Sequence, residues 1–308
     1  MQQQGAAIVC AEAMPVAEAV AVPVKAGWLP EYYMADWGPE KRHRFEQLAA
    51  ELEWDTASIQ EAAHVLAGAN VVVIADDSGS MGHSVRNSPV PPPPGQHVTS
   101  RWDELMHFLS LVLRIGAELA GRVHFHFLNG GVISDVQVWE QVEHIARRGP
   151  SGRTPLLAAM RQVFEQYDPA KTECRLVTII ATDGVPSDGP TAGVAVALKQ
   201  RPSVDKSFVT FLSCTDNDRD VAYIKELDAG LPHVDEVDDY YTERAEVARA
   251  GGRSVYKNFS VGDWALRAVV GAAVPAWDKS DEPATRGKAT RGVACCAGKA
   301  AESFPARR

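Results

Sequence analysis

Five oxygen-bearing side chains in this 308-residue chain have the types and order of a metal site. Asp76, Ser78 and Ser80 form a D-x-S-x-S pattern in the stretch VVVIADDSGSMG, while Thr154 and Asp183 stand in the segments GRTPLL and IIATDG. Carboxylate and hydroxyl oxygens are hard ligands that suit Mg²⁺ or Mn²⁺ in octahedral coordination. The set contains no histidine or cysteine, so its chemistry argues against zinc.

The charge of this set indicates what else the ion would bind. Two aspartates only balance a divalent ion, and one or both can act through water. The hydroxyls are weak neutral ligands, so an open position on the ion would accept an external carboxylate. The pattern therefore predicts capture of an Asp or Glu side chain of a partner protein. Asp77 lies between the patterned positions. For it, facing solvent or hydrogen-bonding the loop backbone is at least as well supported as a ligand role.

Alternating apolar strands and amphipathic helices must position these residues. We expect strands at 71–75, 123–129, 176–182 and 207–214, shorter ones at 132–139 and 254–259, and helices at 101–119, 154–167, 191–200, 217–230 and 261–274. Continuously apolar strands between helices indicate an α/β, doubly wound, mostly parallel sheet flanked by helices. Ligands bind such sheets at the carboxyl ends of the strands. Asp76 and Asp183 each follow a strand, so they should meet at that edge.

The complete set resembles the metal-ion-dependent adhesion site (MIDAS) of von Willebrand factor type A (vWA) domains. The resemblance covers roughly residues 67–275, and we place the domain at 67–277. It implies a Rossmann-like doubly wound fold, a Mg²⁺-type ion and metal-dependent protein binding, with the ion held by Asp76, Ser78, Ser80, Thr154 and Asp183. The chain departs from the commoner pattern in a proline-rich insertion at 85–99, which could cover the site or change its choice of ligand.

Two other functions use the same residues. A phosphohydrolase of the haloacid dehalogenase type also begins with a strand ending in aspartate, but it needs D-x-D where this chain has Ser78. The segment SGSMG resembles a nucleophile elbow around Ser80, yet no later Asp and His follow at clear strand ends. We expect no enzymatic activity, with a metal-dependent hydrolase as the alternative. A scaffold whose metal is only structural is the third hypothesis.

The segments outside the sheet give further expectations. Residues 1–30 are expected to form a disordered tail, 31–66 a helical lead segment packed on the main domain or serving as a separate partner-binding element, and 278–308 a disordered basic tail. Cys295 and Cys296 in that tail are either candidates for acylation or incidental. The loop at 85–99 is expected to be stiff and solvated, and 89–94 is a candidate docking segment for a proline-binding domain.

Bulk properties exclude several classes of partner. The net charge of −9 disfavours nucleic acid. No apolar run reaches 18 residues, so no membrane span is expected. An odd number of cysteines, five, and the lack of a secretory signal pattern favour a cytoplasmic location. The acidic stretch 234–241 is expected to be a solvated loop, and His124 and His126 a structural pair beneath a helix.

Overall fold

A six-stranded sheet forms the centre of the molecule. The computed structural model describes Met34, residues 37–54, 56–215, 217–249 and 259–274, and Trp277. The strands are β1 (Asn70–Ala75), β2 (Arg122–Phe127), β3 (Gly131–Ile133), β4 (Leu176–Thr182), β5 (Ser207–Ser213) and β6 (Val234–Val237), in the order β3-β2-β1-β4-β5-β6. All are parallel except β3, which pairs antiparallel at one edge. The predicted α/β fold with a mostly parallel sheet is confirmed, and it is compatible with a Rossmann-like arrangement.

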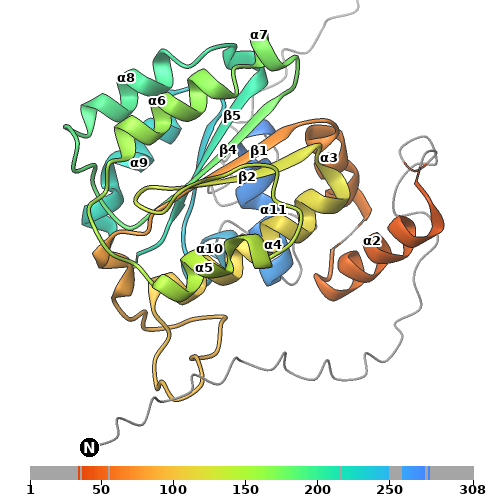
Figure 1. Cartoon of the computed structure of the whole chain (residues 1–308), viewed down its shortest axis with the longest axis horizontal. Helices are drawn as coiled ribbons and strands as arrows, with labels where there is room; N and C mark the ends of the chain where they lie inside the picture. The colour runs from red at the N-terminus through yellow and green to blue at the C-terminus, as the bar shows by residue number, and fades with distance from the viewer. Residues whose placement is uncertain are drawn as a thin grey trace, which may run out of the picture.

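Helices cover both faces of the sheet, which explains why the strands are apolar throughout. In β1, Val71 and Val73 join one buried cluster, whereas Val72 and Ile74 join the other. The first cluster is shared with α2 (Pro39–Glu51), α3 (Thr56–Leu66), α4 (Arg101–Leu119), α5 (Glu140–Arg148), α10 (Tyr240–Arg249) and α11 (Val261–Val270). The second is shared with α6 (Leu156–Gln166), α8 (Ala192–Lys199) and α9 (Asp218–Gly230), which lie across the sheet (Figure 1).

The helix that follows the D-x-S-x-S motif begins and ends where the sequence predicts. The side chain of Ser100 accepts from the Asp103 N–H at 3.2 Å, and the Asp103 carboxylate accepts from the Ser100 N–H at 2.8 Å. This reciprocal capping box satisfies two backbone donors that the first turn leaves without partners. It fixes Arg101 as the first residue of α4.

The lead segment packs against the main domain as a helical pair. Phe45 and Leu48 of α2 and Ile59 and Leu66 of α3 are buried in the same cluster as α4. The expected tails at 1–30 and 278–308, including Cys295 and Cys296, lie outside the described residues, as do residues 254–258 of the expected last strand. Within the described ranges, every helix is too short or too polar to cross a membrane.

The acidic stretch 234–241 is not a solvated loop, and that expectation was wrong. It forms β6 and the start of α10, with Asp235 fully buried and Glu236 8% exposed. Ser213 donates to Glu236 at 2.6 Å, and Arg267 lies 3.9 Å from Asp235. These partners are distant in sequence, so the local pattern could not reveal them. Burial raises the pKa of Glu236 to about 8.

The proline-rich loop is closed at its base by a short stem. Ser84 and Ser100 form an antiparallel bridge, and the Val85 N–H donates to Thr99 O at 2.9 Å. Between them the chain has no helix or strand, as predicted, and it projects from the body of the molecule beside the short 3₁₀ helix η1 (Gly79–Gly82; Figure 1).

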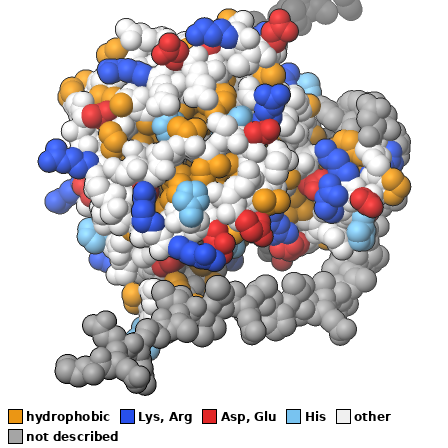
Figure 2. Space-filling view, in the orientation of Figure 1, with side chains coloured by type: hydrophobic (Ala, Val, Ile, Leu, Met, Phe, Trp, Pro, Cys, Tyr) orange, Lys and Arg blue, Asp and Glu red, His pale blue; other side chains and the backbone are white. Residues whose placement is uncertain are grey.

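On the face shown in Figure 2, acidic and basic side chains are interspersed.

Candidate metal centre

Asp76 anchors the site at the carboxyl end of β1. Its side chain is fully buried and accepts two hydrogen bonds, from the Ser78 N–H at 2.8 Å and from the Thr182 hydroxyl at 2.7 Å. Thr182 is the last residue of β4, so this contact joins the ends of two adjacent strands. Burial raises the pKa of the Asp76 carboxyl, because the charged form loses water, and the hydrogen bonds to it act in the opposite direction.

The two serines connect the end of β1 to Asp183. Ser78 precedes η1 and Ser80 lies within it, and their hydroxyl oxygens are 3.0 Å apart. The Ser80 hydroxyl donates to Asp183 Oδ1 at 2.8 Å. The structure therefore brings Asp76, Ser78, Ser80 and Asp183 together, as the sequence pattern predicts.

Thr154 reaches the same edge through its backbone. Its carbonyl accepts from the Ser187 N–H at 2.8 Å, in the loop that follows Asp183. Two residues earlier, the Gly152 carbonyl accepts from the Gly79 N–H at 3.2 Å. The loop carrying Thr154 thus lies between η1 and the loop after β4. Among the described residues, the Thr154 hydroxyl forms no hydrogen bond to the other four members of the set.

Asp77 organises the loops around the site. Its fully buried carboxylate accepts from the Asn129 N–H at 2.7 Å and from Arg148 Nη2 at 2.5 Å, and its carbonyl accepts from the Ser151 N–H at 2.7 Å. Of the alternatives for this residue, the solvent-facing one is wrong and the hydrogen bond to the loop backbone is confirmed. Asp77 holds the loop after β2, the end of α5 and the loop before α6 against the motif.

Three of the oxygens are hydrogen-bonded to one another, and their spacing also matches that of adjacent ligands on a small hard cation. Oxygens in adjacent positions on an octahedral Mg²⁺, at about 2.0–2.1 Å from the ion, lie about 2.9 Å apart. The Ser78–Ser80 and Ser80–Asp183 oxygen pairs are 3.0 and 2.8 Å apart. Both Asp183 oxygens already accept hydrogen bonds, but each carboxylate oxygen has a second lone pair. The described residues contain no group of three His, Cys, Asp or Glu placed to hold a metal. The candidate set is of another kind, with two carboxylates and three hydroxyls.

Three residues at this edge were missed by the sequence analysis. Thr182 donates to Asp76, and Arg101 joins Asp183 to Thr215, with Nη1 2.8 Å from Asp183 Oδ2 and Nη2 2.8 Å from Thr215 Oγ1. Thr215 follows β5 as Asp183 follows β4, so the rule of strand carboxyl ends could have found it. Arg101 has no comparable local signal, because α4 alone brings it there.

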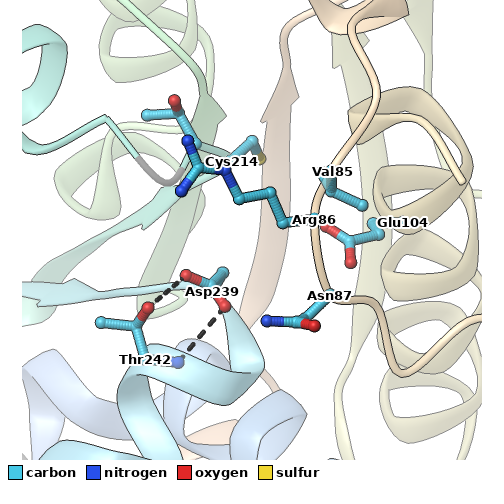
Figure 3. Close-up of a pocket in the computed structure, with 8 residues that line it drawn as sticks. Val85, Arg86, Asn87, Glu104, Cys214, Asp239 and Thr242 are labelled. Carbon is cyan, nitrogen blue, oxygen red and sulfur yellow. Dashed lines mark hydrogen bonds between the residues drawn. The ribbon is translucent and has the colours of Figure 1, made fainter.

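A cavity of about 250 Å³ lies next to Arg101. Thr215, which accepts a hydrogen bond from Arg101, is one of its lining residues. Its lining residues come from the stem of the proline-rich loop, α4, the end of β5 and the start of α10: Val85, Arg86, Asn87, Glu104, Cys214, Thr215, Asp239 and Thr242 (Figure 3). Burial raises the pKa of Glu104 to about 7. Arg86 extends from the stem across the cavity toward the end of β5 (Figure 3). The cavity is therefore lined by charges of both signs.

His124 is a structural residue, as expected. Its Nδ1 accepts from the Asp135 N–H at 3.0 Å, and its ring packs on Tyr167 with centroids 4.5 Å apart. Burial lowers the pKa of both His124 and His126, which favours the neutral imidazole. Tyr167, just after α6, covers the ring of His124. Among the described residues, no hydrogen bond joins His124 or His126 to the candidate metal centre.

Comparisons with known proteins leave the family open. No protein-family description and no curated protein sequence matches the chain. It is similar to the pilus adhesin SpaC from Lactobacillus rhamnosus GG, with 15% identity and a TM-score of 0.35 over 48% of this chain and 25% of SpaC. The open conformation of SpaC has 13% identity to this chain and a TM-score of 0.36, over 56% of this chain and 28% of SpaC. Proximal thread matrix protein 1 from the mussel byssus has 14% identity and a TM-score of 0.33, over 48% of this chain and 37% of that protein. The chain thus spans 25–37% of the length of these proteins, and the scores carry no argument about function.

Proposed function

We propose that this chain is a divalent-cation-dependent protein-binding module of the vWA type. It binds Mg²⁺ or Mn²⁺ through Asp76, Ser78, Ser80, Thr154 and Asp183, and it captures an acidic side chain of a partner protein at that ion. The observation that carries the proposal is the set of oxygen–oxygen distances at the strand ends. Ser78, Ser80 and Asp183 present oxygens 3.0 and 2.8 Å apart beside the fully buried carboxylate of Asp76.

The charges support a cation at this position. A buried carboxylate is costly unless a cation or several donors compensate it. Asp76 has two hydrogen bonds, and among the described residues it forms no ion pair. Its remaining lone pairs are available to a metal ion. Both oxygens of each aspartate accept a hydrogen bond, but only Asp183 also has an ion pair, with Arg101. Asp76 therefore gains most from a bound cation.

The hydroxyl geometry favours binding over catalysis. A bound Mg²⁺ supplies an electron-poor centre that can accept a carboxylate from outside the chain. Ser78 and Ser80 are engaged with each other, and Ser80 donates its proton to Asp183. A serine nucleophile needs a base to take that proton, usually a histidine. In the described part of the chain, no histidine hydrogen-bonds to either hydroxyl.

Isothermal titration with Mg²⁺ and Mn²⁺ tests the proposal. Wild type should bind close to one ion per chain, and Asp76→Ala and Asp183→Ala should lose that binding. Asp205→Ala is the matched control, because Asp205 is exposed and stands just before β5, at the opposite edge of the sheet. Absence of binding by wild type at millimolar ion would overturn the proposal and favour a scaffold role.

The same samples separate the hydrolase alternative. Generic phosphomonoester and ester substrates are incubated with wild type and Mg²⁺. The proposal expects no turnover above that of Asp76→Ala. Turnover that needs both Mg²⁺ and Asp76 would instead assign a metal-dependent hydrolase to the site.

A further inference from the structure

Arg101 is held beside the candidate metal centre from three directions. Its backbone N–H donates to His83 O at 3.0 Å, directly after η1. Its Nη1 lies 2.8 Å from Asp183 Oδ2, and its Nη2 lies 2.8 Å from Thr215 Oγ1. Only 12% of its side chain is exposed. The guanidinium is therefore a fixed positive charge next to one of the two carboxylates of the centre.

The hydrogen bonding of Arg101 is incomplete. A guanidinium has five N–H donors, and these two contacts use one on each terminal nitrogen. The buried Nε has no acceptor among the described residues. A buried donor without an acceptor costs free energy. This observation is independent of the ion pair with Asp183, and it indicates that the surroundings of Arg101 favour a further anionic or oxygen-bearing group.

The positive charge changes what the centre can bind. Asp76 and Asp183 alone would neutralise a divalent ion, whereas the two aspartates with Arg101 carry a net charge of −1. Arg101 competes with the ion for Asp183, so it opposes metal binding to the free centre. Once the ion is bound, the same charge leaves the centre net positive. A carboxylate arriving at the ion restores neutrality, because its charge offsets that of Arg101.

We infer that Arg101 makes metal binding and carboxylate binding cooperative at this centre. It weakens the affinity of the free centre for Mg²⁺ or Mn²⁺, and it strengthens the binding of a carboxylate to the metal-loaded centre. Linkage requires the two effects to be reciprocal, so a carboxylate raises the affinity for the ion by the same factor. This inference rests on the proposed function. It makes Arg101 a residue that selects an acidic partner over a neutral one.

Electron paramagnetic resonance of free Mn²⁺ tests the inference on the full chain. Each protein is titrated with Mn²⁺ in chloride and in acetate at equal ionic strength, with acetate as the simplest carboxylate. In wild type, acetate should lower the dissociation constant for Mn²⁺. In Arg101→Gln, the dissociation constant in chloride should fall about three- to tenfold, and the gain from acetate should shrink.

Two further variants separate position from charge. Arg153→Gln removes the same charge from an exposed side chain one residue before Thr154, and water and salt screen that charge. It should change the Mn²⁺ affinity by no more than about twofold. Arg101→Lys keeps a positive charge near Asp183 but cannot also reach Thr215 as the guanidinium does, so its Mn²⁺ affinity and its gain from acetate should stay closer to those of wild type than to those of Arg101→Gln.

The outcomes distinguish this inference from the proposed function. If wild type does not bind Mn²⁺, or Asp76→Ala binds it equally well, the proposed function is wrong. If wild type binds through Asp76 but Arg101→Gln binds Mn²⁺ with equal or lower affinity, Arg101 is only structural and the inference is overturned. Circular dichroism checks that the variants fold. If only Arg101→Lys folds, a several-fold gain in its Mn²⁺ affinity, or loss of its response to acetate, overturns the inference.

Discussion

Two regions of this molecule place a pair of buried carboxylates next to one arginine, and they differ in how the charges are matched. In the buried cluster formed by Asp235, Glu243 and Arg267, the guanidinium contacts Glu243 and lies 3.9 Å from Asp235, and all three side chains are at most 1% exposed. At the candidate metal centre, Arg101 contacts Asp183 but forms no ion pair with Asp76.

This difference separates a structural charge cluster from a binding site. In the buried cluster both carboxylates lie within 4 Å of the same guanidinium. At the candidate metal centre Asp183 has a cation, whereas Asp76 has only hydrogen-bond donors, and this difference is what the proposed divalent ion would offset. Buried acidic residues alone do not identify a site. We propose that the carboxylate without a cation does, and each side of this contrast can be tested.

The largest expected effect comes from breaking the buried cluster. Arg267→Met leaves Asp235 and Glu243 without their cation and should lower the free energy of unfolding by about 3–5 kcal/mol. Urea denaturation followed by circular dichroism measures it. Arg153→Gln is the control for removal of an exposed arginine and should stay within about 0.5 kcal/mol of wild type. Similar losses in the two variants would show that the cluster does not contribute to stability.

A smaller but ion-dependent effect is expected at the metal centre. Mg²⁺ at about a hundred times its dissociation constant should raise the free energy of unfolding of wild type by about 2.7 kcal/mol. Asp76→Asn should abolish that gain. In chelator it should remain within about 1 kcal/mol of wild type, because the amide keeps an acceptor for Ser78 and removes a charge that burial disfavours. Thermal melts with and without Mg²⁺ measure the gain, and a variant that still responded to the ion would contradict this prediction.

Glu104 gives a pH-dependent test of the charges around Arg101. Its pKa of about 7 in the folded chain lies above the ordinary 4.5, so folding takes up a proton between these values. Wild type should therefore lose stability relative to Glu104→Gln as the pH rises from about 4.5 to 7 and beyond, by about 2 kcal/mol after allowance for partial exposure. Urea denaturation at pH 5 and pH 8 measures the change. If the difference in free energy of unfolding between the two proteins were the same at both pH values, the pKa of Glu104 would not be raised by folding.

The smallest expected effects come from two matching capping boxes. Ser100 with Asp103 begins α4, and Ser260 with Asp263 begins α11. Ser100→Ala and Ser260→Ala should each cost about 1 kcal/mol of stability. Only Ser100→Ala should also alter Mg²⁺ affinity, by at most about threefold, because Arg101 is the next residue. Denaturation and metal titration of both variants check this, and equal effects on Mg²⁺ affinity would remove the link between α4 and the centre.

The parts of the fold that the sequence predicts are those whose signals are local. Continuous apolar runs identify β1 and β4, and helical periodicity with Ser100 identifies α4 to the residue. The ends of those strands then bring Asp76 and Asp183 to one edge. The short strand expected at 132–139 forms only over Gly131–Ile133, because the following residues turn into α5.

What the sequence does not predict depends on partners far along the chain. β6 is charged yet buried, and its carboxylates face Arg267 and Ser213, which lie in other parts of the chain. Arg101 is 82 residues from Asp183, and nothing near it in sequence indicates the contact. Such pairs become visible only when the fold places them together.

The stem below the proline-rich loop makes that segment interchangeable. The bridge between Ser84 and Ser100 and the bond from Val85 to Thr99 fix the spacing of His83 and Arg101 whatever lies between. Residues 91–98, beyond the last bond of the stem from the Thr99 hydroxyl to Val90 O, are therefore an insertion point at which length and composition can vary while the edge with the candidate metal centre keeps its register. A foreign peptide grafted there would be displayed beside the candidate centre.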